Sequence, residues 1–268
     1  MIKDIRLLFL CLVVAPAVTA QHKKIAYGSN PSAGKYYSIR NIQLYCEIYG
    51  KGKPLLLIHG NGGSINAFEN NIAYFSKHYK VIAVDSRAQG RSTDNGDSLS
   101  FEMMADDFAA LLDKLHIDSA YIIGWSDGGI NAIVMALRHP GKVIKFAATG
   151  ANLRPDSTAF GSAGWKEMQQ YYEANRNKVR SSAKERNDWK LFLLDCLQPD
   201  ILPAALEKIK CPALIIAGDH DVIATEHTVD IYKHIPAAEL WILPGCGHST
   251  LVEQPAIFNQ TVDHFFSK

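Results

Sequence analysis

The chain has 268 residues, 47% hydrophobic and 21% charged, which is typical of a globular protein and excludes disordered, collagen-like and disulfide-scaffold chains. Its 28 lysines and arginines against 27 aspartates and glutamates give a formal net charge of +1. Because electrostatic nucleic-acid binding needs a clustered basic excess, no nucleic-acid partner is expected. No linker rich in Pro, Gly or Ser divides the chain, so its length favours one large core that carries an insertion.

The first twenty residues differ in kind from the rest. Lys3 and Arg6 precede an apolar stretch that ends in small or short side chains at Ala20. This order is typical of a secretory signal peptide, and we expect cleavage after Ala20. An uncleaved anchor is the weaker alternative, because Pro16 interrupts a run already shorter than the roughly 20 residues of a spanning helix. The mature chain, residues 21–268, would then be exported to the periplasm or secreted, without stable membrane insertion.

Removal of this segment takes the basic count from 28 to 26 and the acidic count from 27 to 26, so the mature chain would be formally neutral. No charged partner is implied by that balance. Four cysteines remain in a compartment that permits disulfides, and their three possible pairings stay open. A core of this size needs no cross-link, so we expect buried free thiols. The cysteines are too scattered for a zinc site: Cys46, Cys196, Cys211 and Cys246.

The mature chain opens on two alternating, β-rich segments that predict antiparallel strands, at residues 36–39 and 42–49. Helix-period segments, such as residues 101–115, then alternate with short apolar runs. Such runs are typical of strands buried on both faces, and the alternation predicts an α/β fold with a mostly parallel central sheet and helices on both faces. A last helix, at about residues 254–266, would close one face. The apolar runs are residues 54–58, 81–84, 120–123, 143–148, 213–217 and 239–243.

The alternation stops between about residues 153 and 210, where polar helical segments at 164–174 and 183–197 replace apolar strands. We interpret this stretch as a small helical lid inserted into a single domain that spans residues 21–268. Its aromatic residues indicate an apolar or aromatic pocket, although lid aromatics equally often form core. They are Phe160, Trp165, Tyr171, Tyr172 and Trp189.

A serine flanked by glycines follows the apolar run at residues 120–123. The sequence there is Gly124-Trp125-Ser126-Asp127-Gly128-Gly129, and a helical segment follows from 130 to 137. A G-x-S-x-G match alone is weak, but between a strand and a helix it is typical of a sharp turn that exposes the serine hydroxyl at the end of the sheet. We therefore expect Ser126 to be a nucleophile rather than a helix cap.

A serine nucleophile needs a base, and the base needs a carboxylate that orients it. Candidates for both follow late strands, at the edge where open parallel sheets bind ligands. His248 lies in a glycine-flanked turn after the last apolar run, and we expect it to be the base. Asp219 and Asp221 both follow the run at 213–217, so either carboxylate could serve.

Attack on a carbonyl produces an oxyanion, which two preorganised N–H donors would stabilise. The segment His59-Gly60-Asn61-Gly62-Gly63 follows the first buried run, and its glycines allow backbone amides to face inward. We expect the amides of Asn61 and Asp127 to be these donors. The Asp127 carboxylate, in the first turn of a helix, would also be stabilised by the helix dipole.

In these features the chain resembles the α/β-hydrolase superfamily, with the elbow, lid, acid and histidine in the family's order. The family's spacing places the acid three residues after the glycine, which assigns Asp221 and leaves Asp219 to brace the loop. Residues 85–92 also resemble its D-x-R-G-x-G-x-S turn, with Ala88 where glycine is usual. The elbow is most similar to that of valacyclovir hydrolase-like (biphenyl hydrolase-like) esterases, where the residue matching Asp127 faces a substrate ammonium group.

Together these features predict an exported serine hydrolase that cleaves a carboxylic ester through Ser126, His248 and Asp221 and an acyl-enzyme intermediate. A C–C bond hydrolase, an amidase or peptidase, and an acyltransferase would use the same groups and stay open as alternatives. A catalytically silent binding module is disfavoured, because such modules usually lose a triad residue. No metal or organic cofactor is implied. The expected partner is a small ester-like molecule, and the oligomeric state stays open.

Overall fold

The computed structural model describes residues 25–94 and 96–268, so the predicted signal peptide at residues 1–20 lies outside the described part. Eight strands of this part form one sheet in the order β1-β2-β4-β3-β5-β6-β7-β8. Pairing is parallel from β4 through β8 in that order, whereas β2 pairs antiparallel with both β1 and β4. The strands span Gly34–Ile39 (β1), Ile42–Tyr49 (β2), Lys53–Ile58 (β3), Tyr79–Val84 (β4), Ala120–Trp125 (β5), Val143–Thr149 (β6), Ala213–Gly218 (β7) and Ala238–Leu243 (β8).

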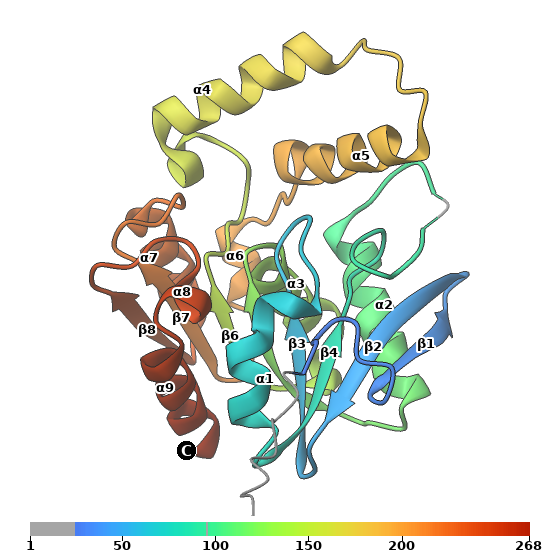
Figure 1. Cartoon of the computed structure of the whole chain (residues 1–268). Coiled ribbons are helices and arrows are strands. Elements are labelled where there is room, and N and C mark those ends of the chain that lie inside the picture. Colours follow the sequence, from blue (N-terminus) through green and yellow to red (C-terminus); the bar gives the residue numbers. More distant parts are fainter. Residues whose placement is uncertain (1–24, 95) are drawn as a thin grey trace, which may run out of the picture.

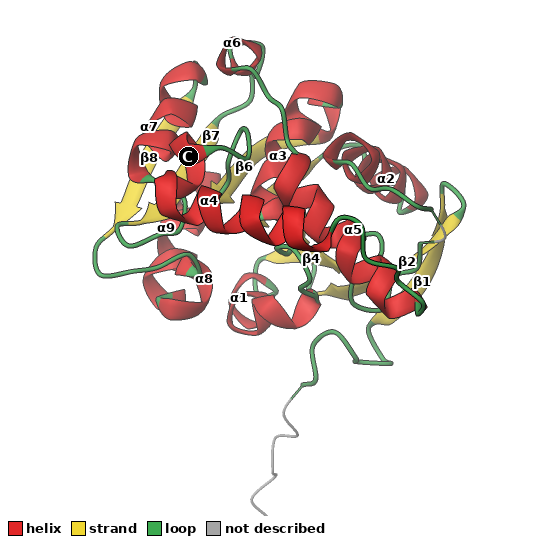
Figure 2. Cartoon of the chain, turned by 90° about the horizontal axis from the view of Figure 1, so that it is seen from above, coloured by secondary structure: helices red, strands yellow, loops and turns green. Residues whose placement is uncertain are grey.

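Helices cover both faces of this sheet, as the sequence predicts. Seen from above, α1, α8 and α9 lie on one side and α2, α3, α6 and α7 on the other (Figure 2). Helices α4 and α5 extend across one end of the sheet (Figure 1). The helices span Glu69–Phe75 (α1), Phe101–Lys114 (α2), Asp127–Arg138 (α3), Ser157–Asn175 (α4), Ala183–Leu197 (α5), Pro203–Leu206 (α6), Thr225–His234 (α7), Thr250–Glu253 (α8) and Pro255–Ser267 (α9), with 3₁₀ turns at Ile65–Phe68 and Pro140–Lys142.

The continuous apolar runs arise because both faces of the central strands are buried. In β3, Leu55 and Leu57 face the core beneath α1 and α9, whereas Leu56 and Ile58 face the core beneath α2 and α3. All four side chains are at most 1% exposed. Successive residues of a strand point to opposite faces, so burial on both sides demands an apolar residue at every position.

Two helices begin earlier than the sequence predicts. Helix α3 starts at Asp127, directly after the serine turn. The apolar pattern places the start of this helix too late, because the glycines of the first turn add nothing to that pattern. Helix α4 starts at Ser157, where the Asp156 side chain accepts hydrogen bonds from the amides of Thr158 and Ala159. Asp156 is therefore an ordinary N-cap. A prediction from the apolar pattern alone misses it, because the capping residue is polar. Gly161, at φ 66°, breaks α4 near its start.

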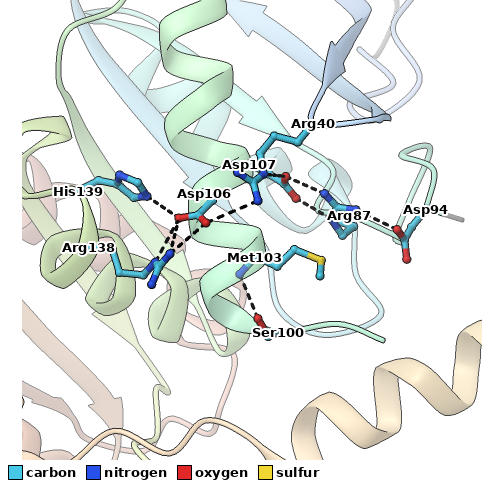
Figure 3. Close-up of polar contacts among 9 residues, drawn as sticks. All are labelled: Arg40, Arg87, Asp94, Ser100, Met103, Asp106, Asp107, Arg138 and His139. Atoms are coloured by element: carbon cyan, nitrogen blue, oxygen red, sulfur yellow. Dashed lines mark hydrogen bonds and ion pairs between the residues drawn. The ribbon is translucent and has the colours of Figure 1, made fainter. Parts of the chain in front are cut away.

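The segment predicted to be a lid contains α4, α5 and α6, between β6 and β7. Helix α5 is joined to the body of the protein by Lys190, whose ammonium contacts the Asp94 carboxylate and donates to the carbonyl of Gly96 at 2.8 Å. Asp94 in turn accepts a hydrogen bond from Arg87 at 2.9 Å, and Arg87 also pairs with Asp107 of α2 at 2.6 Å (Figure 3). A buried chain of ion pairs therefore connects α5 to α2.

Within the described ranges, no helix combines the length and the apolar character needed to cross a membrane. The four cysteines in these ranges are free thiols, and three of them are buried. The expectation of free thiols is therefore met. Burial raises the pKa of the Cys246 thiol to about 11, so this cysteine is not a ready nucleophile.

Candidate active site

Ser126 occupies a strained turn between β5 and α3. Its φ of 56° and ψ of −119° lie in a region that costs a residue with a side chain about 1–3 kcal/mol. The flanking glycines make this turn possible by close backbone contact. A Cβ on Gly124 would lie 2.0 Å from the carbonyl oxygen of Gly128, and a Cβ on Gly128 would lie 1.9 Å from that of Ile58. The G-x-S-x-G spacing is therefore a steric requirement here.

The turn brings Ser126 to a histidine and a carboxylate from two later loops. His248 Nε2 lies 3.0 Å from Ser126 Oγ. His248 Nδ1 lies 2.6 Å from Asp221 Oδ1, and the Asp221 side chain is fully buried whereas that of His248 is 24% exposed. The predicted nucleophile, base and acid thus form one continuous hydrogen-bonded chain.

The Asp221 carboxylate is held by its own loop. Its Oδ1 also accepts a hydrogen bond from the amide of Ile223 at 2.9 Å, while Oδ2 is buried without a hydrogen-bond partner among the described residues. Asp219, the other candidate, instead accepts hydrogen bonds from the amide of Cys246 at 3.2 Å and from His220 Nδ1 at 2.7 Å. Asp219 therefore braces the loop, as the sequence predicts.

Two further residues lie against His248, and the sequence analysis assigned neither of them a role at the histidine. Trp125 donates its indole N–H to the backbone carbonyl of His248 at 3.0 Å. Gly150, at φ 65°, lies against the imidazole, since a Cβ there would be 2.7 Å from His248 Cε1. A glycine just after β6 is the only signal for the second contact, and glycines after strands are common.

The glycine-rich turn after β3 also lies close to Ser126. A Cβ on Gly60 would lie 3.0 Å from Ser126 Cβ, so the backbone of this turn passes close to the serine. The turn is held by Gly62, whose amide donates to Gln89 Oε1 at 2.7 Å, and by His59, whose Nε2 accepts from the amide of Ser86 at 3.0 Å. Asn61 therefore lies in a turn that is braced on both sides.

The side chains of the two predicted oxyanion residues also contact each other. Asn61 Nδ2 donates to Asp127 Oδ2 and to the carbonyl oxygen of Leu191 on α5, each at 3.1 Å. The carboxyl of Asp127 is hydrogen-bonded to that of Asp195, also on α5. Sequence reasoning missed Asp195, because nothing in the helical pattern of the lid distinguishes it from a solvated acid.

Burial and the neighbouring Asp195 raise the pKa of Asp127 well above its ordinary value. Burial also raises the pKa of Asp195, against the opposing effects of its hydrogen bonds to Asp127 and Asn61 and of the nearby His248. Two carboxyl groups in contact cannot both ionise cheaply, so Asp127 holds the shared proton. Asp127 is therefore more than a helix-stabilising charge. In the described part of the chain, no group of three or more His, Cys, Asp or Glu residues could hold a metal ion.

Comparison with known proteins agrees with this architecture. A family model described as the alpha/beta hydrolase fold matches residues 53–167. The chain is 26% identical to the serine hydrolase BPHL of Homo sapiens over 261 residues, 90% of this chain and 88% of that protein. It is also 26% identical to 3-oxoadipate enol-lactonase 2 of Acinetobacter baylyi over 257 residues, 84% of this chain and 93% of that protein.

A solved structure, the meta-cleavage product hydrolase CumD of Pseudomonas fluorescens IP01, is similar with a TM-score of 0.70 and 25% identity. The match covers 89% of this chain and 99% of that one. The family model, which is described by its fold, and this structural similarity both agree with the α/β architecture of the chain. The chain therefore has the α/β-hydrolase fold and is similar to hydrolases with that fold.

Proposed function

We propose that this protein is a serine hydrolase that cleaves a small carboxylic ester. The observation that carries the proposal is the hydrogen-bonded chain from Ser126 through His248 to the buried Asp221, with Ser126 on a strained turn between a strand and a helix. Strain of this kind persists where function requires it. The similarity to a serine hydrolase and to an enol-lactonase, which is named for a cyclic ester, supports this chemistry.

The geometry supports a two-step reaction. Ser126 Oγ attacks the acyl carbon while His248 Nε2 takes its proton, and Asp221 orients the imidazole and stabilises its charged form. The amides of Asn61 and Asp127 bind the oxyanion. His248 then passes the proton to the departing alcohol, and water, deprotonated by His248, hydrolyses the acyl-enzyme. These steps need neither a metal nor an organic cofactor.

Hydrolysis of a C–C bond is the second candidate. The structural similarity to a meta-cleavage product hydrolase favours it, since that protein matches nearly its full length. The same three side chains would serve, because acceptor and substrate choice depend on the pocket and the lid rather than on the triad.

A fluorophosphonate probe and a set of p-nitrophenyl esters would test the mechanism and the bond type together. We expect the mature protein to be labelled and to hydrolyse the esters, and Ser126→Ala to lose both by at least about three decades. Ser162→Ala, an exposed serine on α4, is the matched control and should behave as wild type. If the protein is labelled and turns over a meta-cleavage product but none of the esters, the bond that it cleaves is a C–C bond rather than an ester. Folded protein that is never labelled would contradict the proposal.

We also propose that the protein acts outside the cytoplasm, after cleavage behind Ala20. The charged and apolar order of residues 3–20 supports this proposal. Sequencing the N-terminus of protein recovered from the exported fraction should give Gln21 first. A chain that retains Met1 and stays in the cytoplasmic fraction would exclude export.

A further inference from the structure

The lid contacts the predicted oxyanion site through side chains of α5. Asn61 and Asp127, whose backbone amides are the expected donors, are joined to each other by the 3.1 Å hydrogen bond from Asn61 Nδ2 to Asp127 Oδ2. Helix α5 adds the Leu191 carbonyl oxygen on the Asn61 side and the Asp195 carboxyl on the Asp127 side. Both donors are therefore tied to the same turn of one helix.

The contact between Asp127 and Asp195 exists only while the two carboxyls share a proton. A carboxylate has no donor, so a hydrogen bond between two carboxyl groups needs one of them to be protonated. Asp127 is 2% exposed, and water cannot replace the lost bond cheaply once both groups are charged. Two like charges in contact would then push α5 away from the serine turn.

We propose that Asp195 is a positioning residue that holds the oxyanion amides of Asn61 and Asp127 in place through a proton shared with the Asp127 carboxyl. The inference rests on the proposed serine-hydrolase function and adds a residue of the lid to it. It also gives that function an upper pH limit, because the contact is intact while the pair keeps one proton and is lost as the pH rises through the raised pKa of Asp127.

The groups that face Asp195 are few. Asp127 lies opposite on α3, the neutral amide of Asn61 lies on the turn after β3, and His248 acts on Asp195 from the loop after β8. On its own helix, Asp195 lies next to the Cys196 thiol, whose pKa burial raises. His248 therefore supplies a competing explanation, namely that Asp195 matters only as a negative charge near the imidazole.

The rate of labelling by a fluorophosphonate tests the proposal without knowledge of the substrate. In this reaction the Ser126 Oγ–P bond forms, the P–F bond breaks, fluoride leaves and His248 takes the hydroxyl proton. The phosphoryl oxygen then occupies the oxyanion site. Rates would be measured from about pH 5 to about pH 10, with circular dichroism to verify folding at each pH.

We expect the wild-type rate to fall as the pH rises through the raised pKa of Asp127. Asp195→Ala should lower the rate about 10- to 100-fold at neutral pH, up to the loss typical of a missing oxyanion donor. Asp195→Asn should restore most of the rate, because its amide donates to the Asp127 carboxylate without a shared proton. For the same reason the labelling rate of Asp195→Asn should show no such decrease with rising pH. Asp188→Asn, an exposed acid on α5 that pairs with Lys184, is the matched control and should keep the wild-type profile.

Each other outcome overturns the inference. Equal losses in Asp195→Ala and Asp195→Asn would assign Asp195 a purely electrostatic role on His248. A wild-type rate in Asp195→Ala, or a decrease with rising pH that persists in Asp195→Asn, would show that the shared proton does not matter. If Asp195→Ala does not fold, the pH profile of Asp195→Asn decides alone. If folded wild-type protein is never labelled, the proposed function itself is wrong. If wild-type protein is labelled and the Asp195 variants behave like it, only this inference is wrong.

Discussion

At the scale of single residues, the candidate site depends on backbone conformations that most side chains avoid. Ser126 has a φ of 56°, and Ala88 has a φ of 65° at the position where glycine is usual. Gly150 has a similar φ of 65° and lies directly against His248. The strained conformation of Ser126 presents its hydroxyl to His248. Gly150 leaves the space that the imidazole of His248 occupies, because a glycine has no Cβ.

Gly150→Ala should therefore displace the imidazole. Its Cβ would lie 2.7 Å from His248 Cε1 and 2.9 Å from Nδ1, closer than real Cβ contacts, so we expect a fall in kcat of about 100-fold for a misplaced base. The measurement is ester hydrolysis or fluorophosphonate labelling of the folded variant. Gly245→Ala is the control, because Gly245 has nearly the same φ of 64° but no atoms within 4 Å of a Cβ. Equal losses in both variants would attribute the effect to strain alone.

The sequence identified most of the site residues because motifs place them. Ser126, Asp221 and His248 each follow a strand of one parallel sheet, and the ends of such strands meet at one edge. The structure brings these three together by hydrogen bonds, and it separates Asp221 from Asp219. Their catalytic roles stay predictions that the labelling experiment tests.

At the scale of elements, α5 of the predicted lid is joined to the body of the protein by a buried ion pair. Lys190 is 7% exposed and joins α5 to Asp94 beside the loop after β4. Burial alone would raise the pKa of Asp94, but hydrogen bonds from Lys190 and Arg87 outweigh it and lower that pKa. The same helix carries Asp195, so the anchor and the proposed positioning residue lie on one rigid element.

Lys190→Met should loosen this anchor. It leaves the buried Asp94 carboxylate with Arg87 as its remaining ionic partner, so we expect a loss of about 2–3 kcal/mol in the free energy of unfolding, below the roughly 3–5 kcal/mol of a fully orphaned buried charge. Denaturant unfolding measures this loss, and limited proteolysis should cut the link between α4 and α5 faster. Lys184→Met, which breaks an exposed i,i+4 pair with Asp188 on the same helix, should cost no more than about 0.5 kcal/mol. Similar losses in both variants would contradict an anchoring role for Lys190.

At the scale of the whole molecule, buried ionisable groups make the stability depend on pH in opposing directions. Burial lowers the pKa of His59 to about 4 against the effect of its hydrogen bond to Gly60. Below its ordinary pKa of 6.5, the unfolded chain therefore binds a proton that the folded chain refuses, and stability falls as the pH drops towards 4. Burial raises the pKa of Asp85 to about 6, which has the opposite sign: stability falls as the pH rises from 3.8 to 6.

The contribution of His59 can be isolated by a difference between two proteins. From pH 7 to pH 4, His59 alone should cost the wild type about 3 kcal/mol of unfolding free energy. His59→Gln should be less stable at pH 7, where it loses hydrogen bonds, but should lack this pH-dependent part, while Asp85 contributes equally to both and cancels. Urea unfolding at both pH values gives the difference, with the exposed His78→Gln as the control. A difference that stays constant with pH would show that His59 is not kept neutral by the fold.

By itself the sequence determined a mostly parallel sheet with strands buried on both faces and singled out Ser126 and His248, because burial on two faces and a turn between strand and helix both leave local patterns. The choice of Asp221 over Asp219 came from the family resemblance. The tertiary structure decided what local patterns cannot encode. Asp195 lies 68 positions from Asp127 in the chain, and only the path of α5 over the serine turn brings the two carboxyls into contact. Gly150 likewise matters only because the loop after β8 places His248 against it. Contacts between segments that are distant in the chain depend on tertiary packing. A single sequence contains both residues of such a contact but no local pattern that pairs them.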